Sequence, residues 1–150
     1  MSPAAFLDAN VVVYSAGRSH ALQRPSASIL DFAAQHPRSF VTDAEVLQEL
    51  LHRFLALRMW PDARGTFTDF SELMRGRIEP LYAEDVERAA DLAGQHPHLS
   101  ARDLVHIAVM ERLGVTAIVS ADRDFDAPPG IRRLDPADVE SWRAEIEAAS

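Results

Sequence analysis

Four acidic residues stand at positions where they could share one site and bind a divalent metal ion. Asp8 follows the first apolar run of the chain, and Asp122 follows a later one after a two-residue link. Glu49 lies within a predicted helix, and Asp103 lies in the first turn of another. Isolated carboxylates are costly to bury without a partner or a metal, so Asp8 beside apolar residues requires an explanation.

A divalent cation would provide that explanation. Converging carboxylates repel one another and raise each other's pKa unless a cation neutralises them. The chain has no cysteine, which leaves oxygen and imidazole ligands and favours hard cations. We therefore expect Mg²⁺. Such a site can polarise a phosphodiester, activate water and stabilise the leaving oxygen, with two ions about 3.5 to 4 Å apart when both are bound.

Several neighbouring polar residues could have a structural role, as helix caps or turn formers, instead of a role in the metal site. Glu45 fits the back-bonding position of a capping box, and Asp103 fits the same position less well because its side chain is shorter. Asn10 is either a supporting residue of the site or the cap of a short helix beginning near residue 11. Asp124 is a candidate outer ligand or a turn former, and Asp126 is predicted to bond its own backbone in a turn.

Two histidine positions also have metal-binding alternatives. His106 follows Asp103 by three residues, on the same side of the predicted helix. We expect it to be packed and hydrogen-bonded, with a role as ligand or general base as the alternative. The histidines of the segment His-Pro-His at residues 96–98 are expected to lie in a loop between helices.

Short apolar runs alternate with longer segments of 3.6-residue periodicity, as in a parallel sheet covered by helices on both faces. In such sheets the ligand crevice lies beyond the carboxyl ends of the strands, where the candidate acids fall. The predicted strands are Ala4–Leu7, Ser39–Val41, Ile78–Leu81, Thr116–Val119 and Ile131–Leu134. The predicted helices are Pro25–Gln35, Ala44–Arg58, Ala63–Arg75, Glu84–Gln95, Ala101–Leu113 and a last one from Pro136 to about Ala148.

Local residue patterns mark several boundaries of these elements. Thr42 and Ser100 are predicted N-caps, each three residues before a carboxylate. Gly114 is a predicted C-terminal stop, and residues 126–130 form a predicted turn containing two prolines and a glycine.

Length and composition predict one soluble domain spanning residues 1–150. The sequence has no apolar stretch of membrane-spanning length and no signal-peptide pattern, so we expect a cytoplasmic protein without a membrane partner. The net charge of −8 argues against a nucleic-acid partner, but residues 1–78 are electrically balanced and the remainder carries the excess. All fifteen cationic residues are arginine, which suits phosphate contacts, although a GC-rich genome produces the same bias.

Four segments in this order resemble the motifs of PIN-domain ribonucleases, and the chain length is similar to that of the VapC toxins of toxin–antitoxin pairs. The segments are LDANVVVYSAG with Asp8, VLQELLHR with Glu49, SARDLVHIAV with Asp103 and IVSADRDF with Asp122. The resemblance spans roughly residues 4–134. It implies a three-layer α/β/α PIN-like fold with a short parallel sheet of four to five strands.

The resemblance also implies a Mg²⁺- or Mn²⁺-dependent endoribonuclease, homodimeric and inhibited by a cognate antitoxin. It assigns the metal and catalytic roles to Asp8, Glu49, Asp103 and Asp122, and a supporting hydrogen bond to Ser120. Asn10 and Asp124 complete the supporting set. Arginines 18, 24, 53 and 58 are candidates for the RNA backbone, with surface salt bridges as the alternative.

Other functions remain open at this point. A processing nuclease or a non-catalytic PIN-like module that binds RNA or protein shares the same motifs. A haloacid-dehalogenase-like phosphatase is disfavoured because Asn10 replaces the second Asp of its opening motif and the chain has no lysine. Apolar residues crowd two predicted helices and could seat a second subunit or an antitoxin helix. These are Phe54, Leu55, Leu57, Met59, Trp60, Phe67, Phe70, Leu73 and Met74.

Overall fold

The structure is a computed structural model that describes residues 3–17 and 19–149. Within these residues, five short strands form one parallel sheet in the order β3-β2-β1-β4-β5. The strands are β1 (Ala5–Leu7), β2 (Phe40–Asp43), β3 (Ile78–Glu79), β4 (Ala117–Val119) and β5 (Arg132–Leu134). The predicted parallel sheet is confirmed, with each strand shifted by a residue or two from its predicted bounds.

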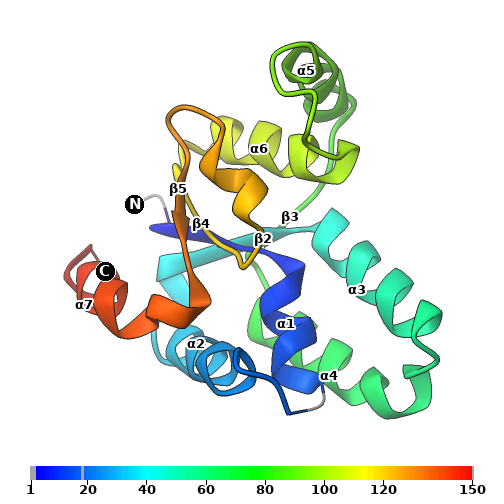
Figure 1. The fold of residues 1–150 in the computed structure, drawn as a ribbon, viewed down its shortest axis with the longest axis vertical. Coiled ribbons are helices and arrows are strands. Elements are labelled where there is room, and N and C mark those ends of the chain that lie inside the picture. Colours follow the sequence, from blue (N-terminus) through cyan, green and yellow to red (C-terminus); the bar gives the residue numbers. More distant parts are fainter. Residues whose placement is uncertain (1–2, 18, 150) are drawn as a thin grey trace.

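Seven α-helices in the described residues cover the sheet on both faces (Figure 1). They are α1 (Ala9–Ala16), α2 (Gln23–Gln35), α3 (Ala44–Ala56), α4 (Trp60–Leu73), α5 (Ala83–Ala93), α6 (Ala101–Leu113) and α7 (Val139–Ala149). Figure 1 shows α5 and α6 on one side of the sheet, and α1, α2 and α4 on the other. The three-layer α/β/α architecture expected from the sequence is therefore confirmed.

The strand order explains where ligands would bind. Strand β1 is central, and the chain leaves it toward β2 on one side but reaches β4 on the other. This change of direction makes the carboxyl ends of β1 and β4 a topological switch point, where open parallel sheets bind their ligands. The two strands are in register, with Phe6 beside Ile118 and Leu7 beside Val119. Asp8 and Ser120, the next residues, consequently emerge side by side.

The core forms along the sheet from the residues that the apolar runs supply. Phe6, Phe32, Phe40 and Phe54 are fully buried, as is Phe125 beyond β4. Burial of such side chains stabilises the fold by about 1.5 to 3 kcal/mol each before the entropic cost of ordering is subtracted. The core continues into α7 through Val139, Trp142 and Ile146.

Two predicted boundaries are confirmed and one is wrong. Ser100 caps α6 by accepting a hydrogen bond from the backbone N–H of Asp103 at 3.2 Å, and Gly114 ends the helix in the left-handed region with φ of 71°. Thr42 is not the cap of α3. It belongs to β2, where its hydroxyl donates to the Leu7 carbonyl, and Asp43 caps the helix instead.

Within the described residues, none of the helices is both long and apolar enough to cross a membrane.

Candidate metal centre

Asp8 lies at the carboxyl end of β1, 4% exposed, and holds the start of α1. Its Oδ1 accepts a hydrogen bond from the Ala9 backbone N–H at 2.8 Å. Its Oδ2 accepts from the Ser120 hydroxyl at 2.6 Å and from the Asn10 amide at 3.1 Å. Both oxygens of this buried carboxylate therefore have hydrogen-bond donors. The side chain is therefore fixed in place for a role at this edge of the sheet.

Asn10 and Ser120 join the ends of β1 and β4. The Asn10 amide donates to Ser120 Oγ at 3.0 Å, and its Oδ1 accepts from the Ala121 backbone N–H at 3.1 Å. Ser120 Oγ also accepts from the Asp122 backbone N–H at 3.0 Å. The structure thus places both predicted supporting residues beside Asp8. The alternative in which Asn10 caps α1 is wrong, because the helix begins at Ala9, two residues before the predicted start, and Asp8 is its cap.

Asp122 and Asp124 lie in the turn that follows β4. Asp122 Oδ1 accepts from the Asp124 backbone N–H at 2.9 Å and so starts the short 3₁₀ helix Arg123–Asp126. Asp103 from α6 joins them, and one carboxylate oxygen from each of these three residues lies within 4.8 Å of the other two. Asp126 does not bond its own backbone as predicted. Its carboxylate pairs with Arg133 at 2.9 Å, which directs it away from this group.

Asp103 has a perturbed acidity that reflects this environment. Burial raises its pKa to about 6, and the negative charges of Asp8 and Asp122 add to the rise, while the Ser100 hydrogen bond opposes it. A carboxyl group in this state is costly to ionise until a cation arrives. Ser100 caps α6 through its own side chain, and among the described residues no hydrogen bond from the Ser100 backbone N–H to the Asp103 carboxylate completes a capping box.

Glu49 approaches Asp8 from α3. Burial raises its pKa, and the charge of Asp8 contributes to the rise. Glu45 lies one turn earlier and is not part of a capping box, because Asp43 is the cap and places Glu45 at the second helical position. Arg102 of α6 lies near both acids, with its Nη1 3.6 Å from Glu49 Oε1 and its Nε 3.7 Å from Glu45 Oε1. It provides a partial counter-charge at the rim of the acidic group.

The structure adds one buried pair that the sequence reasoning missed. Asp43 and His106 are both fully buried, and Asp43 Oδ2 lies 2.7 Å from His106 Nδ1. The other ring nitrogen, Nε2, lies 4.0 Å from Asp8 Oδ1. Burial alone would lower the pKa of His106, but Asp43 and the charges of Asp8 and Glu49 raise it to about 9.

A sequence rule could have found Asp43. Like Asp8, it follows an apolar run at the end of a predicted strand, and the strand-end argument that selected Asp8 applies to it equally. The expectation that His106 is packed and hydrogen-bonded is confirmed.

The donor set fits a divalent ion. Asp8, Glu49, Asp103 and Asp122 come from four different elements, and they lie near one another at one edge of the sheet, where the charge of Asp8 acts on both Glu49 and Asp103. A second group of possible ligand atoms, from Asp8, Glu49 and His106, also lies within 4.8 Å of one another. Nε2 of His106 is buried and has no hydrogen-bond partner among the described residues. Buried polar atoms are almost always paired, so this nitrogen is available to a cation or another partner.

Metal binding should weaken as the pH falls below about 6. The pKa of Asp103 in the metal-free protein is about 6, and a protonated carboxyl is a poor ligand. Because this pKa is raised above its unfolded value of roughly 3.9, ionising Asp103 also destabilises the metal-free protein as the pH rises from about 4 to 6. Thermal unfolding with and without Mn²⁺ tests this: the ion should raise the midpoint more at pH 7.5 than at pH 5. An equal rise of the unfolding midpoint at both pH values would contradict this prediction. So would an Asp103→Asn variant that shows the same difference between the two pH values as the parent.

Comparison with known proteins agrees with this architecture. The PIN domain family profile matches residues 5–131. The chain is 38% identical to Ribonuclease VapC13 of Mycobacterium tuberculosis over 128 residues, which cover 85% of this chain and 97% of that protein.

Solved structures show the same fold. VapC20 of M. tuberculosis, described as a sarcin-ricin loop cleaving toxin, superposes with a TM-score of 0.66 at 20% identity, over 83% of this chain and 94% of that one. VapBC2 of Rickettsia felis, bound to a DNA fragment from their promoter, gives 0.67 at 14% identity, over 87% and 97%. The profile match and the identity to a VapC ribonuclease over most of both chains are sufficient to assign the family. The chain therefore belongs to the PIN-domain family, among its VapC-type members.

Proposed function

We propose that this protein is a metal-dependent endoribonuclease and the toxin of a toxin–antitoxin pair. The observation that carries the proposal is the convergence of Asp8, Glu49, Asp103 and Asp122 at the switch point of the sheet. The identity to VapC ribonucleases supports the same activity. We further propose that residues 1–150 form one PIN domain, since α7 packs into the core that the earlier elements build.

The four acids would hold one or two divalent ions, with Mg²⁺ and Mn²⁺ as the candidates. A bound ion supplies charge neutralisation at the scissile phosphate and lowers the pKa of bound water. The chain's own residues prepare the site: Ser120 and Asn10 fix Asp8, and Asp122 is oriented by the turn that it caps. Asp124 would assist from the rim, where it is exposed.

RNA would approach over the carboxyl edge of the sheet. Arg102 lies at the rim of the site and is within 3.7 Å of Glu45 and 3.6 Å of Glu49, so it is placed to exchange these contacts for a phosphate. Arg24, Arg53 and Arg58 are exposed, as contact with the RNA backbone requires. Arg18, the fourth candidate, lies outside the described residues. An RNA substrate also leads us to propose a cytoplasmic location.

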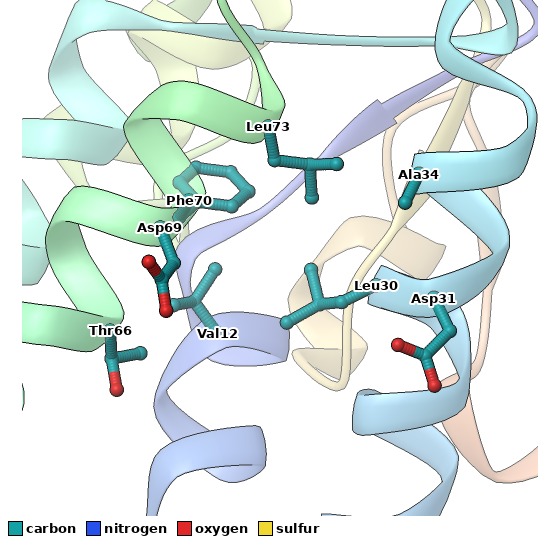
Figure 2. Close-up of a pocket in the computed structure, with 8 residues that line it drawn as sticks. All are labelled: Val12, Leu30, Asp31, Ala34, Thr66, Asp69, Phe70 and Leu73. Atoms are coloured by element: carbon teal, nitrogen blue, oxygen red, sulfur yellow. The ribbon is translucent and has the colours of Figure 1, made fainter.

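A groove between α1, α2 and α4 is our proposed seat for the antitoxin (Figure 2). It has a volume of about 300 Å³ and an apolar floor formed by Val12, Leu30, Ala34, Phe70 and Leu73. Figure 2 shows the carboxylates of Asp31 and Asp69 on opposite sides of this floor. The pattern favours a partner segment with an apolar side chain flanked by basic ones. The structural match to VapBC2 supports an antitoxin as this partner.

Reversing a charge at this groove should impair antitoxin binding without affecting RNA cleavage. Asp69→Arg changes an exposed residue beside the apolar floor, and it should slow association with the antitoxin most strongly at low salt. Asp91→Arg on α5 is the control, because it makes the same charge reversal at an exposed residue outside the groove. The association rate measured by surface plasmon resonance checks this, and equal rates for the two variants would contradict the assignment.

We also propose a homodimer that uses exposed apolar side chains at the end of α3. Leu55 and Leu57 are 52% and 56% exposed, and Leu51 is 37% exposed. The other residues of the predicted interface include Phe54, Phe70 and Met74, which are core residues and are unavailable to a partner.

Growth arrest separates the toxin from a processing nuclease. Induced expression should stop growth, and Asp8→Asn should restore it. Continued growth during expression of active nuclease would contradict the toxin assignment.

A further inference from the structure

The imidazole of His106 presents a buried nitrogen that the fold leaves without a hydrogen bond. The residue is fully buried in α6, and its Nε2 has no hydrogen-bond partner among the described residues. Buried polar atoms are almost always paired, because an unpaired one has lost its water and gained nothing in return. An exception directly beside a group of acids calls for a functional explanation.

The orientation of the ring is set by Asp43. A carboxylate can only accept, so Nδ1 donates its proton to Asp43 Oδ2 at 2.7 Å. The ring is also tilted against Phe6, with centroids 5.2 Å apart. These contacts direct Nε2 at Asp8 Oδ1, 4.0 Å away, which is too long for a hydrogen bond. Metal-binding histidines commonly donate one ring N–H to a carboxylate and bind the metal through the other nitrogen. Nδ1 and Nε2 of His106 are placed in the same way, between Asp43 and the acidic cluster.

The spacing accommodates an ion. One ligand atom each from Asp8, Glu49 and His106 lies within 4.8 Å of the other two. Ligands about 2.0 to 2.2 Å from a shared metal stand roughly 3 to 4.3 Å apart, so small side-chain movements suffice.

We propose that His106 is a nitrogen ligand of an inner metal subsite, shared with Asp8 and Glu49, and that this subsite prefers a transition metal such as Mn²⁺ over Mg²⁺. The inference rests on the metal site of the proposed function and adds to it. Imidazole suits transition metals, whereas carboxylates and water suit Mg²⁺. The outer group of Asp103, Asp122 and Asp124 offers oxygen only and suits Mg²⁺. The two ends of the acidic cluster therefore differ in metal preference.

The competing role for His106 is that of a protonated internal cation that offsets the charge of Asp8. In that role Nε2 keeps its proton when a metal binds, and the metal has oxygen ligands alone, whereas in the proposed role the metal displaces this proton to solvent. The two roles differ in whether a bound metal contacts nitrogen, which is a spectroscopic question independent of catalysis.

Electron spin echo spectroscopy of the Mn²⁺-loaded full chain answers that question. Protein freed of metal with EDTA and loaded with one equivalent of Mn²⁺ should show the ¹⁴N modulation of a directly bound imidazole. His106→Gln keeps a donor for Asp43 and should still bind Mn²⁺ but lose the modulation. His52→Gln, an exposed histidine on α3 one turn beyond Glu49, is the matched control and should retain it.

Asp43→Asn tests the same arrangement from the other side of the ring. It removes the charge behind the imidazole and should weaken Mn²⁺ binding by about 10- to 100-fold, with a smaller effect on Mg²⁺. If His106→Gln does not fold, the Mn²⁺ to Nε2 distance in crystals of the unaltered protein decides the question.

Each outcome bears on the proposal. Mn²⁺ bound without ¹⁴N modulation, or modulation that persists in His106→Gln, would overturn the nitrogen ligand and leave the proposed nuclease intact. A chain that binds no Mn²⁺ at all would overturn both.

Discussion

Asp8→Asn should reduce RNA cleavage by about 10³-fold or more, which corresponds to a loss of roughly 4 kcal/mol of transition-state stabilisation. Asp8 is the acid whose charge acts on both Glu49 and Asp103, so removing it weakens the site for the metal as a whole. Asparagine caps helices as well as aspartate does, and the fold should therefore persist. Initial rates on total RNA, with Mg²⁺ or Mn²⁺, provide the measurement.

The matched control for this variant is Asp91→Asn, the same chemical change at an exposed position of α5. It should cleave as fast as the parent. Circular dichroism should show the same helix content in all three proteins. A folded Asp8→Asn protein that retains parental activity would refute the assignment of the active site.

Asp43→Ala should be the most destabilising change at the site, with a loss of about 3 to 5 kcal/mol in the free energy of unfolding. The substitution removes the cap of α3, where Asp43 Oδ1 accepts from the Val46 N–H at 2.9 Å, and it leaves the buried His106 without its carboxylate. Total stabilities are of the order of 5 to 15 kcal/mol, so the effect is large. Urea denaturation of the metal-free proteins measures it.

The loss should also depend on pH. The pKa of His106 is raised to about 9, above its unfolded value of roughly 6.5, so its pairing with Asp43 stabilises the protein fully below that unfolded value. This contribution disappears as the pH rises through about 9. The difference in the free energy of unfolding between the parent and Asp43→Ala should therefore be larger at pH 6 than at pH 9.5. Asp43→Asn keeps the cap and serves as the milder comparison; a loss below about 1 kcal/mol for Asp43→Ala would contradict the account.

The fold class and the placement of Asp8 and Asp122 at one edge of the sheet were predictable because both follow from local patterns. The alternation of apolar runs and helical periodicity determines a parallel sheet, and parallel strands bring their carboxyl ends to one edge. Asp8 and Asp122 follow neighbouring strands, and this is sufficient to bring them into one region. Ser100 and Gly114 mark α6 correctly because caps act within a single turn.

The contacts that were missed depend on how elements meet. Thr42 resembles a cap, but pairing of β2 with β3 extends the strand through Asp43, with Thr42 beside Ile78. That extension moves the cap to Asp43 and turns its carboxylate toward His106, 63 residues away. Glu45 faces Arg102 for the same reason. No local pattern encodes these two contacts, because they follow from the register of the strands and the packing of α3 against α6.

The most direct test of the central claim is a crystal structure of the protein soaked with Mn²⁺, with an anomalous difference map to locate the ion. We expect a peak at the carboxyl edge of the sheet, roughly 2 to 2.3 Å from Asp8 and from at least one of the carboxylates of Glu49, Asp103 and Asp122. A map without a peak there, at a Mn²⁺ concentration that supports RNA cleavage, would show that these acids do not form the metal centre.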